Sequence, residues 1–220
     1  MNQIGNLGSN PSLKKLVYET LQKMIVEGKL EPGAKLTEEE LARSMNISRA
    51  PIREALNMLD RDGFVKIVPR KGAVVTEVTA KEAKDIWRCR MVLEPYAAKE
   101  ATPNIPRAEL EALKAKVERL EQEPYNFETH VASDLEIHNL YHRYTGNERL
   151  EAILDNLQAH ATRVRWLREA DDISRAMPSV AILEHKAILE AFLAGDADMA
   201  SWAVQQHMKK GGQRLLGGLD

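Results

Sequence analysis

The stretch from Leu36 to Val75 constrains the fold more than any other part of the sequence. It combines a short helix, a tight turn, a second helix and a basic hairpin, which is the order and spacing of a winged helix-turn-helix. An amphipathic stretch from Ser12 to Glu27 is expected to form a helix that packs behind this unit. These patterns predict a DNA-reading unit in the first part of the chain.

Local signals predict where the two central helices begin and end. Thr37 and Glu40 form a capping box that starts the first helix, and Asn46 suits the left-handed turn that ends it. Ser48 is expected to cap the second helix and Gly63 to end it. The apolar residues of the second helix recur at i, i+3, i+4 and i+7, which buries one face: Ile52, Ala55, Leu56 and Leu59.

Two arginines of the second helix, Arg49 and Arg53, lie one turn apart and project away from that buried face. Arginine can grip a phosphate or a guanine edge with two hydrogen bonds, and helix N-termini attract phosphate, so both positions suit the major groove. A single surface arginine is usually only a solvated charge. The ordered set of helix, turn, helix and basic hairpin favours DNA binding.

The hairpin is the expected wing. The segments near 64–68 and 73–76 are rich in β-branched residues, and a basic turn joins them: Pro69, Arg70, Lys71 and Gly72. Residues 43–72 hold seven Lys/Arg against three Asp/Glu, whereas the whole chain has a formal net charge of −2. The positive charge is therefore concentrated in the proposed DNA-reading unit, where Arg70 and Lys71 are candidate contacts.

Composition limits the class of protein. With 220 residues, 44% of them hydrophobic and 29% charged, the chain is expected to fold as one or two domains. The single cysteine, Cys89, excludes an intrachain disulfide and favours a reducing compartment. No signal peptide and no run of about eighteen apolar residues is present. We therefore expect a cytoplasmic protein with no membrane segment.

After Val78, continuous helical patterns replace the β-branched segments, and Thr79 with Glu82 forms a further capping box. This predicts two domains, 1–78 and 79–220. The second contains six segments of 3.6-residue periodicity, near 80–101, 106–122, 126–145, 148–170, 179–194 and 197–215. The expected fold is mainly α: a winged helix-turn-helix with a small β-hairpin, followed by an all-α six-helix bundle that can enclose a ligand.

The first bundle helix places an arginine on its expected buried face. That face is predicted to contain Ile86, Cys89, Leu93 and Ala97, with Arg90 in the same arc. Cys89 is expected to be a small core residue. A buried charge needs a partner, which is either Glu94 one turn further on or an anionic ligand. The sequence leaves both possibilities open.

Inward-facing acid and histidine residues give the sharpest chemical signal in the bundle. Asp134 and His138 are four residues apart and share a helix face with apolar residues, while His185 and His207 lie on the apolar stripes of two other helices. One carboxylate and three imidazoles suit Zn, Ni, Mn or Fe and leave coordination positions free. A single inward histidine is more often a hydrogen-bonded core residue, and four converging candidates weaken that reading.

Spacing alone does not decide which histidines bind, because His130 and His142 also follow at i+4 steps around Asp134. His160 lacks even this spacing argument.

Three segments together resemble the GntR family of bacterial transcription regulators: Leu30–Gly33, Ser48–Leu56 and Pro69–Gly72. The resemblance implies DNA contacts from the recognition helix and the wing: Ser48, Arg49, Arg53, Lys71 and Gly72. The sequence departs from the family pattern at two positions. Ala50 stands where threonine is frequent, and Glu39 stands where many members carry a DNA-contacting arginine.

The bundle resembles the FCD domain of the FadR subfamily in Asp134–His138 with Gly146–Asn147, and in Glu184–Ile188 with Gly195–Asp196 and His207. Six helices rather than seven resemble the shorter, VanR-like branch. The resemblance implies that the matching residues hold a divalent ion: Asp134, His138, His185 and His207. It also implies an organic acid effector at the open coordination positions. Arg90 is a candidate second anchor for that acid because of its inward position.

The preferred function is an effector-gated repressor that is not an enzyme. As a homodimer it would place two recognition helices about one turn of double-stranded DNA apart on a palindromic operator. A metalloenzyme acting on a small carboxylate is the alternative, because open Asp/His3 sites resemble hydrolase and oxygenase centres. A third possibility is that the metal only stabilises the bundle. Zinc is the first candidate for the ion in each case. The sequence does not identify the effector, the native metal or the operator.

Overall fold

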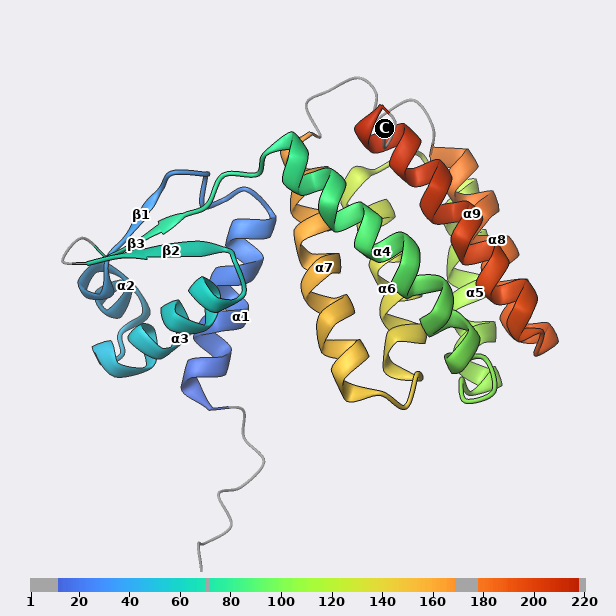
Figure 1. The fold of residues 1–220 in the computed structure, drawn as a ribbon, viewed down its shortest axis with the longest axis horizontal. Coiled ribbons are helices and arrows are strands. Elements are labelled where there is room, and N and C mark those ends of the chain that lie inside the picture. The colour runs from blue at the N-terminus through green and yellow to red at the C-terminus, as the bar shows by residue number, and fades with distance from the viewer. Residues whose placement is uncertain (1–11, 70–71, 169–177, 218–220) are drawn as a thin grey trace, which may run out of the picture. The chain divides into compact units, whose positions relative to one another are not determined.

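The computed structural model describes residues 12–69, 72–168 and 178–217 (Figure 1). Contacts divide the chain into two compact units, residues 1–77 and 78–220. The first unit combines helices with a small antiparallel sheet, and within the described residues of the second unit all regular secondary structure is α-helix. The expected fold class, a winged helix-turn-helix followed by an all-α bundle, is confirmed.

In residues 12–69 and 72–77, the first unit contains three helices and a three-stranded sheet. The helices are α1 (Leu13–Val26), α2 (Glu38–Met45) and α3 (Arg49–Arg61), and the strands are β1 (Lys35–Leu36), β2 (Val65–Val68) and β3 (Gly72–Val75). The strand order is β1-β3-β2, and both pairs are antiparallel. The hairpin was predicted, but β1 was not, because two residues are too few to show an alternating pattern.

Most of the local signals in this unit act as expected. The Thr37 hydroxyl accepts a hydrogen bond from the Glu40 amide at 3.2 Å, and Asn46 ends α2 in the left-handed region with φ 53°. Gly63 follows α3 with φ 85°. The prediction for the Ser48 side chain was wrong, because Ser48 occupies the N-cap position but its hydroxyl makes no capping hydrogen bond. The predicted apolar face of α3 is buried: Ile52, Ala55, Leu56 and Leu59.

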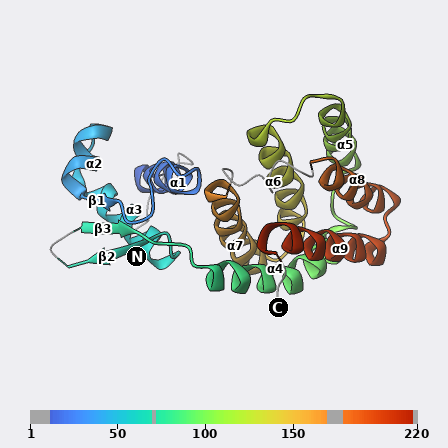
Figure 2. The ribbon, with the colours of Figure 1, turned by 90° about the horizontal axis from the view of Figure 1, so that it is seen from above.

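The second unit contains six helices within its described residues: α4 (Ala80–Ala101), α5 (Arg107–Gln122), α6 (Phe127–Arg143), α7 (Glu148–Leu167), α8 (Pro178–Ala194) and α9 (Ala197–Leu216). Their ends agree with the sequence expectation to within three residues. Helices α4 and α9 run side by side (Figure 2), and α8 packs against both α9 and α5. None of the described helices is both long and apolar enough to span a membrane.

The buried face of α4 agrees with the prediction in part. Ala97 and Arg90 are buried, and Ile86 and Leu93 are half-buried against the core. Cys89 is exposed rather than a core residue, whereas Trp87 and Glu94 are buried. The Trp87 indole donates a hydrogen bond to the Met208 carbonyl of α9 at 2.8 Å. Burial of the large indole ring, together with the hydrogen bond of its N–H group, sets the rotation of α4 about its own axis. The buried side of the helix is therefore shifted from the one that the small apolar residues predicted.

A glycine of α9 makes room for this tryptophan. A Cβ at Gly211 would come within 2.9 Å of the Trp87 ring. The close approach of α4 and α9 therefore depends on the absence of a side chain at this position.

Candidate DNA-reading surface and metal centre

Arg49 and Arg53 of α3 are exposed and pair with glutamates of α2. Arg53 donates through Nε and Nη2 to the two carboxylate oxygens of Glu38, each at 2.7 Å. Arg49 Nη2 lies 3.1 Å from Glu39 Oε2. Exposed ion pairs of this kind contribute little to stability, so phosphate or base oxygens can replace the glutamates.

Glu39 binds two arginines at once. Its other carboxylate oxygen lies 3.2 Å from Nη2 of Arg43, one turn further along α2. The position at which many family members carry a DNA-contacting arginine therefore holds a carboxylate that occupies Arg49 instead. This acidic residue reduces the positive charge beside the recognition helix.

The remaining DNA-contact candidates lie at the start of α3 and in the wing. Ser48 is exposed. Gly72 begins β3 with φ 88°, and a Cβ there would lie 2.5 Å from the Leu36 carbonyl oxygen of β1. Glycine is thus required by the pairing of β1 with β3, whatever its contact with DNA. Arg70 and Lys71 lie outside the described residues.

The four side chains proposed from the sequence as metal ligands meet inside the bundle. The Nε2 atoms of His138 and His207 are 3.3 Å apart, and each is 3.9 Å from Asp134 Oδ1. His185 Nε2 lies 3.2 Å from the same oxygen. All four side chains are buried. Residues from α6, α8 and α9 that are distant in sequence therefore form one cluster.

The grouping is tighter for three of these residues than for the fourth. Ligand atoms of Asp134, His138 and His207 all lie within 4.8 Å of one another. His185 joins them through its contact with Asp134, and its ring centroid lies 4.8 Å from that of His207.

The electrostatics of this cluster suit a divalent ion. Burial lowers the pKa of His138, His185 and His207, which favours neutral imidazoles. Burial would raise the pKa of Asp134, but the charge of Arg165, which also donates a hydrogen bond to its carboxylate, holds that pKa well below the usual range. Neutral imidazoles beside an ionised carboxylate are the donor set that Zn²⁺ and similar ions require, so these residues fit such an ion.

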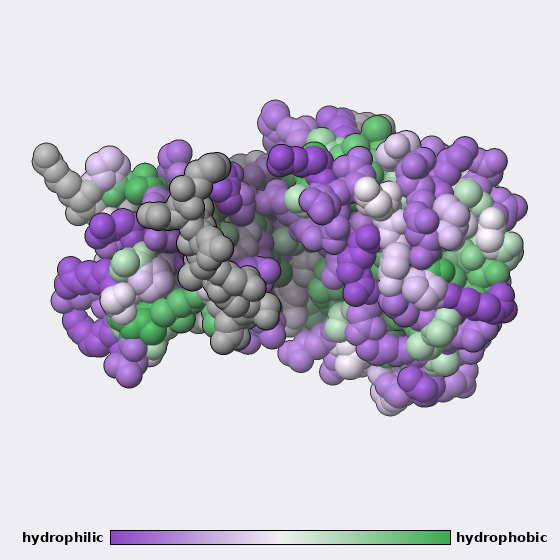
Figure 3. Space-filling view, turned by 90° about the horizontal axis from the view of Figure 1, so that it is seen from below, coloured by the Kyte–Doolittle hydropathy of each residue, from purple (hydrophilic) through white to green (hydrophobic). Residues whose placement is uncertain are grey.

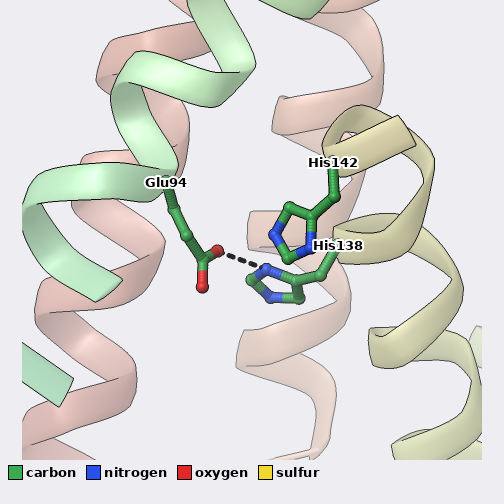
Figure 4. A group of neighbouring side chains, drawn as sticks. All are labelled: Glu94, His138 and His142. Atoms are coloured by element: carbon green, nitrogen blue, oxygen red, sulfur yellow. Dashed lines mark hydrogen bonds and ion pairs between the residues drawn. The ribbon is translucent and has the colours of Figure 1, made fainter. Parts of the chain in front are cut away.

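Arg90 is bound to Glu94, the first of the two partners considered from the sequence. Arg90 Nε donates to Glu94 Oε1 at 2.5 Å, and both side chains are buried. Glu94 Oε2 lies 2.5 Å from His138 Nδ1 and accepts a hydrogen bond from the Tyr141 hydroxyl. Figure 4 marks the contact between Glu94 and His138 with a dashed line. Burial would raise the pKa of Glu94, but Arg90 and His138 hold it well below its usual value. A role for Arg90 in effector binding remains a prediction.

A second buried carboxylate contacts His207. Glu184 Oε2 lies 2.9 Å from His207 Nδ1, and Arg214 donates to both oxygens of Glu184 at 2.7 Å. Burial would raise the pKa of Glu184. Hydrogen bonds from Arg214 and His207 to the carboxylate outweigh this effect and lower that pKa to about 2.

The histidines left open by the sequence occupy different surroundings. His142 is buried and belongs to a second candidate group with Glu94 and His138 (Figure 4), and its Nδ1 lies 3.4 Å from Asp155 Oδ1. His130 Nδ1 is 2.7 Å from the Asn126 carbonyl oxygen. Neither His130 nor His160 belongs to either group found among the described residues.

Sequence reasoning did not identify several residues that support the cluster: Arg165, Glu184 and Arg214. Glu184 stands next to His185 in the segment that resembles the FCD domain, but the sequence assigned it no role. Arg165 is 31 residues from Asp134, and Arg214 is 30 residues from Glu184, so no local pattern connects these pairs.

Two family models cover most of the chain. The model described as "Bacterial regulatory proteins, gntR family" matches residues 13–75, and the FCD domain model matches residues 85–210. The chain belongs to the GntR family. It is a DNA-binding transcription regulator of the branch that carries an FCD domain. This family is one of regulators and not of enzymes, so the metalloenzyme alternative has no support.

Named relatives agree with this assignment. The regulator YdhC of Bacillus subtilis is 30% identical over 197 residues, which cover 86% of this chain and 85% of the relative. The repressor RspR of Escherichia coli is 25% identical and covers 91% of this chain and 89% of its own. The gluconate operon repressor of Bacillus licheniformis is 24% identical, with coverage of 85% and 78%.

Solved structures show the same fold. McbR/YncC of E. coli superposes with a TM-score of 0.75 at 24% identity, covering 92% of this chain and 96% of that one. A GntR regulator from Rhodococcus superposes with a TM-score of 0.74 at 20% identity, covering 94% and 99%.

Proposed function

We propose that this GntR-family regulator is a repressor whose DNA binding is controlled by a small organic acid held at a divalent ion in the FCD domain. The observation that carries the proposal is the buried cluster of Asp134, His138 and His207, with His185 beside it, in a chain that also has a DNA-reading unit. Relatives named as repressors, including RspR and the gluconate operon repressor, support the direction of regulation. Because its target is chromosomal DNA, the protein is proposed to act in the cytoplasm.

The DNA contacts are proposed to come from α3 and the wing: Ser48, Arg49, Arg53, Arg70, Lys71 and Gly72. The exposure of Arg49 and Arg53 supports this assignment, as does their position in the first turns of α3. Residues 1–78 form the DNA-binding domain in this proposal, and residues 79–220 bind the effector and the second subunit.

The ion is proposed to be zinc, with nickel, manganese or iron as the other candidates. Asp134, His138, His185 and His207 would hold it, and the effector carboxylate would occupy positions that these four leave free. Arg165 contacts Asp134 while its own side chain is 27% exposed, so it is available to an acid at the same place. The guanidinium group of Arg90 is buried and paired with Glu94, so an acid could reach it only if this ion pair separated.

The protein is proposed to act as a homodimer. Large hydrophobic side chains remain exposed on the neighbouring helices α4 and α9: Val92, Tyr96, Met199 and Trp202. Figure 3 shows that hydrophobic patches also interrupt the hydrophilic surface of the bundle on another face. A second copy that covers the α4–α9 surface would remove these side chains from water. Two recognition helices related by this symmetry would read a palindromic operator.

Gating requires that the acid bind one arrangement of the dimer more tightly than the other. An acid with equal affinity for both arrangements would shift no population. The test uses the full-length, zinc-loaded protein and an operator selected from a random duplex pool. Thermal shift against gluconate, dicarboxylates and aromatic acids should find at least one stabilising acid, and that acid should weaken operator binding.

Two other outcomes contradict the proposal. If acids change neither the thermal stability nor the DNA affinity of the metal-loaded protein, the ion only stabilises the fold of the bundle. If the metal-loaded protein consumes a candidate acid over many turnovers, the protein is not solely a regulator.

A further inference from the structure

Two histidines of the candidate metal centre each have a carboxylate on the ring nitrogen that faces away from the cluster. His138 Nδ1 lies 2.5 Å from Glu94 Oε2, and His207 Nδ1 lies 2.9 Å from Glu184 Oε2. Their Nε2 atoms face each other and the Asp134 carboxylate. The same arrangement therefore occurs twice, on residues that come from different helices.

Each of these carboxylates is bound by its own arginine. Arg90 donates to Glu94 within α4, and Arg214 of α9 donates to both oxygens of Glu184 on α8. Arginine can only donate hydrogen bonds and stays protonated, so it holds its partner as an ionised acceptor. Two separate chains of arginine, glutamate and histidine thus converge on the cluster.

The carboxylates determine which ring nitrogen carries the proton. An ionised carboxylate only accepts, so a neutral imidazole that faces it donates from Nδ1. The Tyr141 hydroxyl lies 2.5 Å from both Glu94 Oε2 and His138 Nδ1, and its single proton goes to the carboxylate, which leaves His138 Nδ1 as the second donor. The lone pair of each histidine is then on Nε2. Because the two Nε2 atoms are 3.3 Å apart and neither carries a proton, their contact is not a hydrogen bond. Two lone pairs this close together in a buried space repel each other, and a cation bound between them would remove that repulsion.

We propose that Glu94 and Glu184 are positioning residues that hold His138 and His207 as Nε2 ligands, with Arg90 and Arg214 keeping the two carboxylates ionised and oriented. The inference rests on the metal site of the proposed function and extends it to four residues outside the ligand set. It gives Arg90 a structural task inside the protein rather than a contact with the effector. Partners of this kind typically change metal affinity by about 10- to 100-fold.

The decisive variant is Glu94→Gln in the full-length protein. Arg90 can only donate, so it should attract the amide oxygen and leave the amide N–H₂ group facing His138 Nδ1. His138 would then accept at Nδ1 and carry its proton on Nε2, where it cannot bind an ion. The side-chain shape is almost unchanged, so the expected defect comes from the wrong tautomer and not from a cavity.

The first measurement is a Zn²⁺ titration in competition with a chromophoric chelator. Glu94→Gln should bind about 10- to 100-fold more weakly than wild type. Glu118→Gln is the matched control, because Glu118 is a half-exposed carboxylate of α5 that accepts a hydrogen bond from Lys114. The control should bind Zn²⁺ as wild type does. If Glu94→Gln does not fold, Glu184→Gln replaces it in the same titration.

The second measurement is the tautomer of each ring, read from long-range proton–nitrogen NMR spectra of the ion-free protein. Wild type should show a proton on Nδ1 of His138 and His207, and Glu94→Gln should move the His138 proton to Nε2. A merely structural role for Glu94 would leave the tautomer unchanged.

The outcomes distinguish a failure of the metal site from a failure of the positioning role. If wild type binds no Zn²⁺, Ni²⁺ or Mn²⁺, both the proposed metal site and the positioning role are wrong. If wild type binds Zn²⁺ and Glu94→Gln binds it equally well, only the positioning role is overturned. A proton on Nε2 of His138 in ion-free wild type would overturn it as well.

Discussion

Glu38 and Arg53 join the two helices of the helix-turn-helix through a pair of parallel hydrogen bonds, both 2.7 Å long. The hydrogen bonds from Arg53 lower the pKa of Glu38 below its usual value. The guanidinium group is thereby held in an exposed position at the start of the recognition helix. An oriented arginine of this kind is ready to exchange a carboxylate for phosphate or guanine oxygens without a change of fold.

We expect Arg49→Ala and Arg53→Ala each to weaken binding to the selected operator. The loss should be roughly five- to hundredfold if the side chain reads a base, and smaller if it reaches only phosphate. Affinities for operator and scrambled duplexes over a salt series separate the two cases, because a phosphate contact also lowers the salt slope. Arg61→Ala, at the opposite end of α3, is the control. Wild-type operator affinity in both variants would exclude the proposed docking.

Glu39→Gln should strengthen DNA binding. The change removes a negative charge next to Arg49 and releases that arginine from its ion pair. The gain should be roughly two- to fivefold, the scale of an exposed ion pair, and should appear on operator and scrambled duplexes alike. Glu19→Gln on α1 is a matched loss of one exposed charge and should leave affinity unchanged. Weaker binding by Glu39→Gln would mean that the carboxylate itself supports DNA recognition.

His185→Ala should lose the ion and the response to acid while the winged unit stays folded. His185 is a buried residue of the bundle and approaches Asp134 at 3.2 Å, whereas the winged unit has its own core. Elemental analysis measures the ion, and binding to scrambled DNA reports the folding of the winged unit. His130→Ala is the control, since its ring lies outside both candidate groups. Full metal occupancy in His185→Ala would remove this residue from the ligand set.

Arg90→Met should destabilise the bundle strongly. The variant leaves Glu94 buried without its arginine, and breaking a buried ion pair typically costs about 3–5 kcal/mol. Chemical denaturation followed by far-ultraviolet circular dichroism measures the loss. Arg107→Met removes an exposed arginine from a similar pair with Glu111 and should change stability little. If Arg90→Met is as stable as wild type but binds acids weakly, Arg90 is an effector anchor after all.

Stability above pH 10 should depend on Tyr18, whose hydroxyl donates to Asp62 at 2.8 Å. Burial and this hydrogen bond raise the pKa of Tyr18 above its usual value near 10. The folded state therefore keeps the proton that the unfolded chain loses, so the stabilisation is complete below about pH 10 and declines as the pH rises above it. Tyr18→Phe should be less stable than wild type at pH 8 and show a shallower decline above pH 10. Parallel denaturation curves at all pH values would contradict this.

Local sequence signals determined the helices and their ends. Thr37, Asn46 and Gly63 set the helix-turn-helix because capping and left-handed turns depend on only a few neighbouring residues. The six bundle segments followed from 3.6-residue periodicity for the same reason. The pattern Asp134–His138 also placed two polar side chains on one inward face, since residues four apart in a helix share a face.

Only the tertiary structure decided how the bundle helices face one another. Periodicity in α4 favoured burial of Cys89, but packing of Trp87 against α9 turned that residue outward. Strand β1 exists only because β3 lies beside it. The contact of Glu94 with His138 spans 44 residues, and no local pattern encodes such a distance. Which carboxylate meets which imidazole, and so which ring nitrogen faces the cluster, follows from helix packing, because side chains remote in sequence meet only when the whole core has formed.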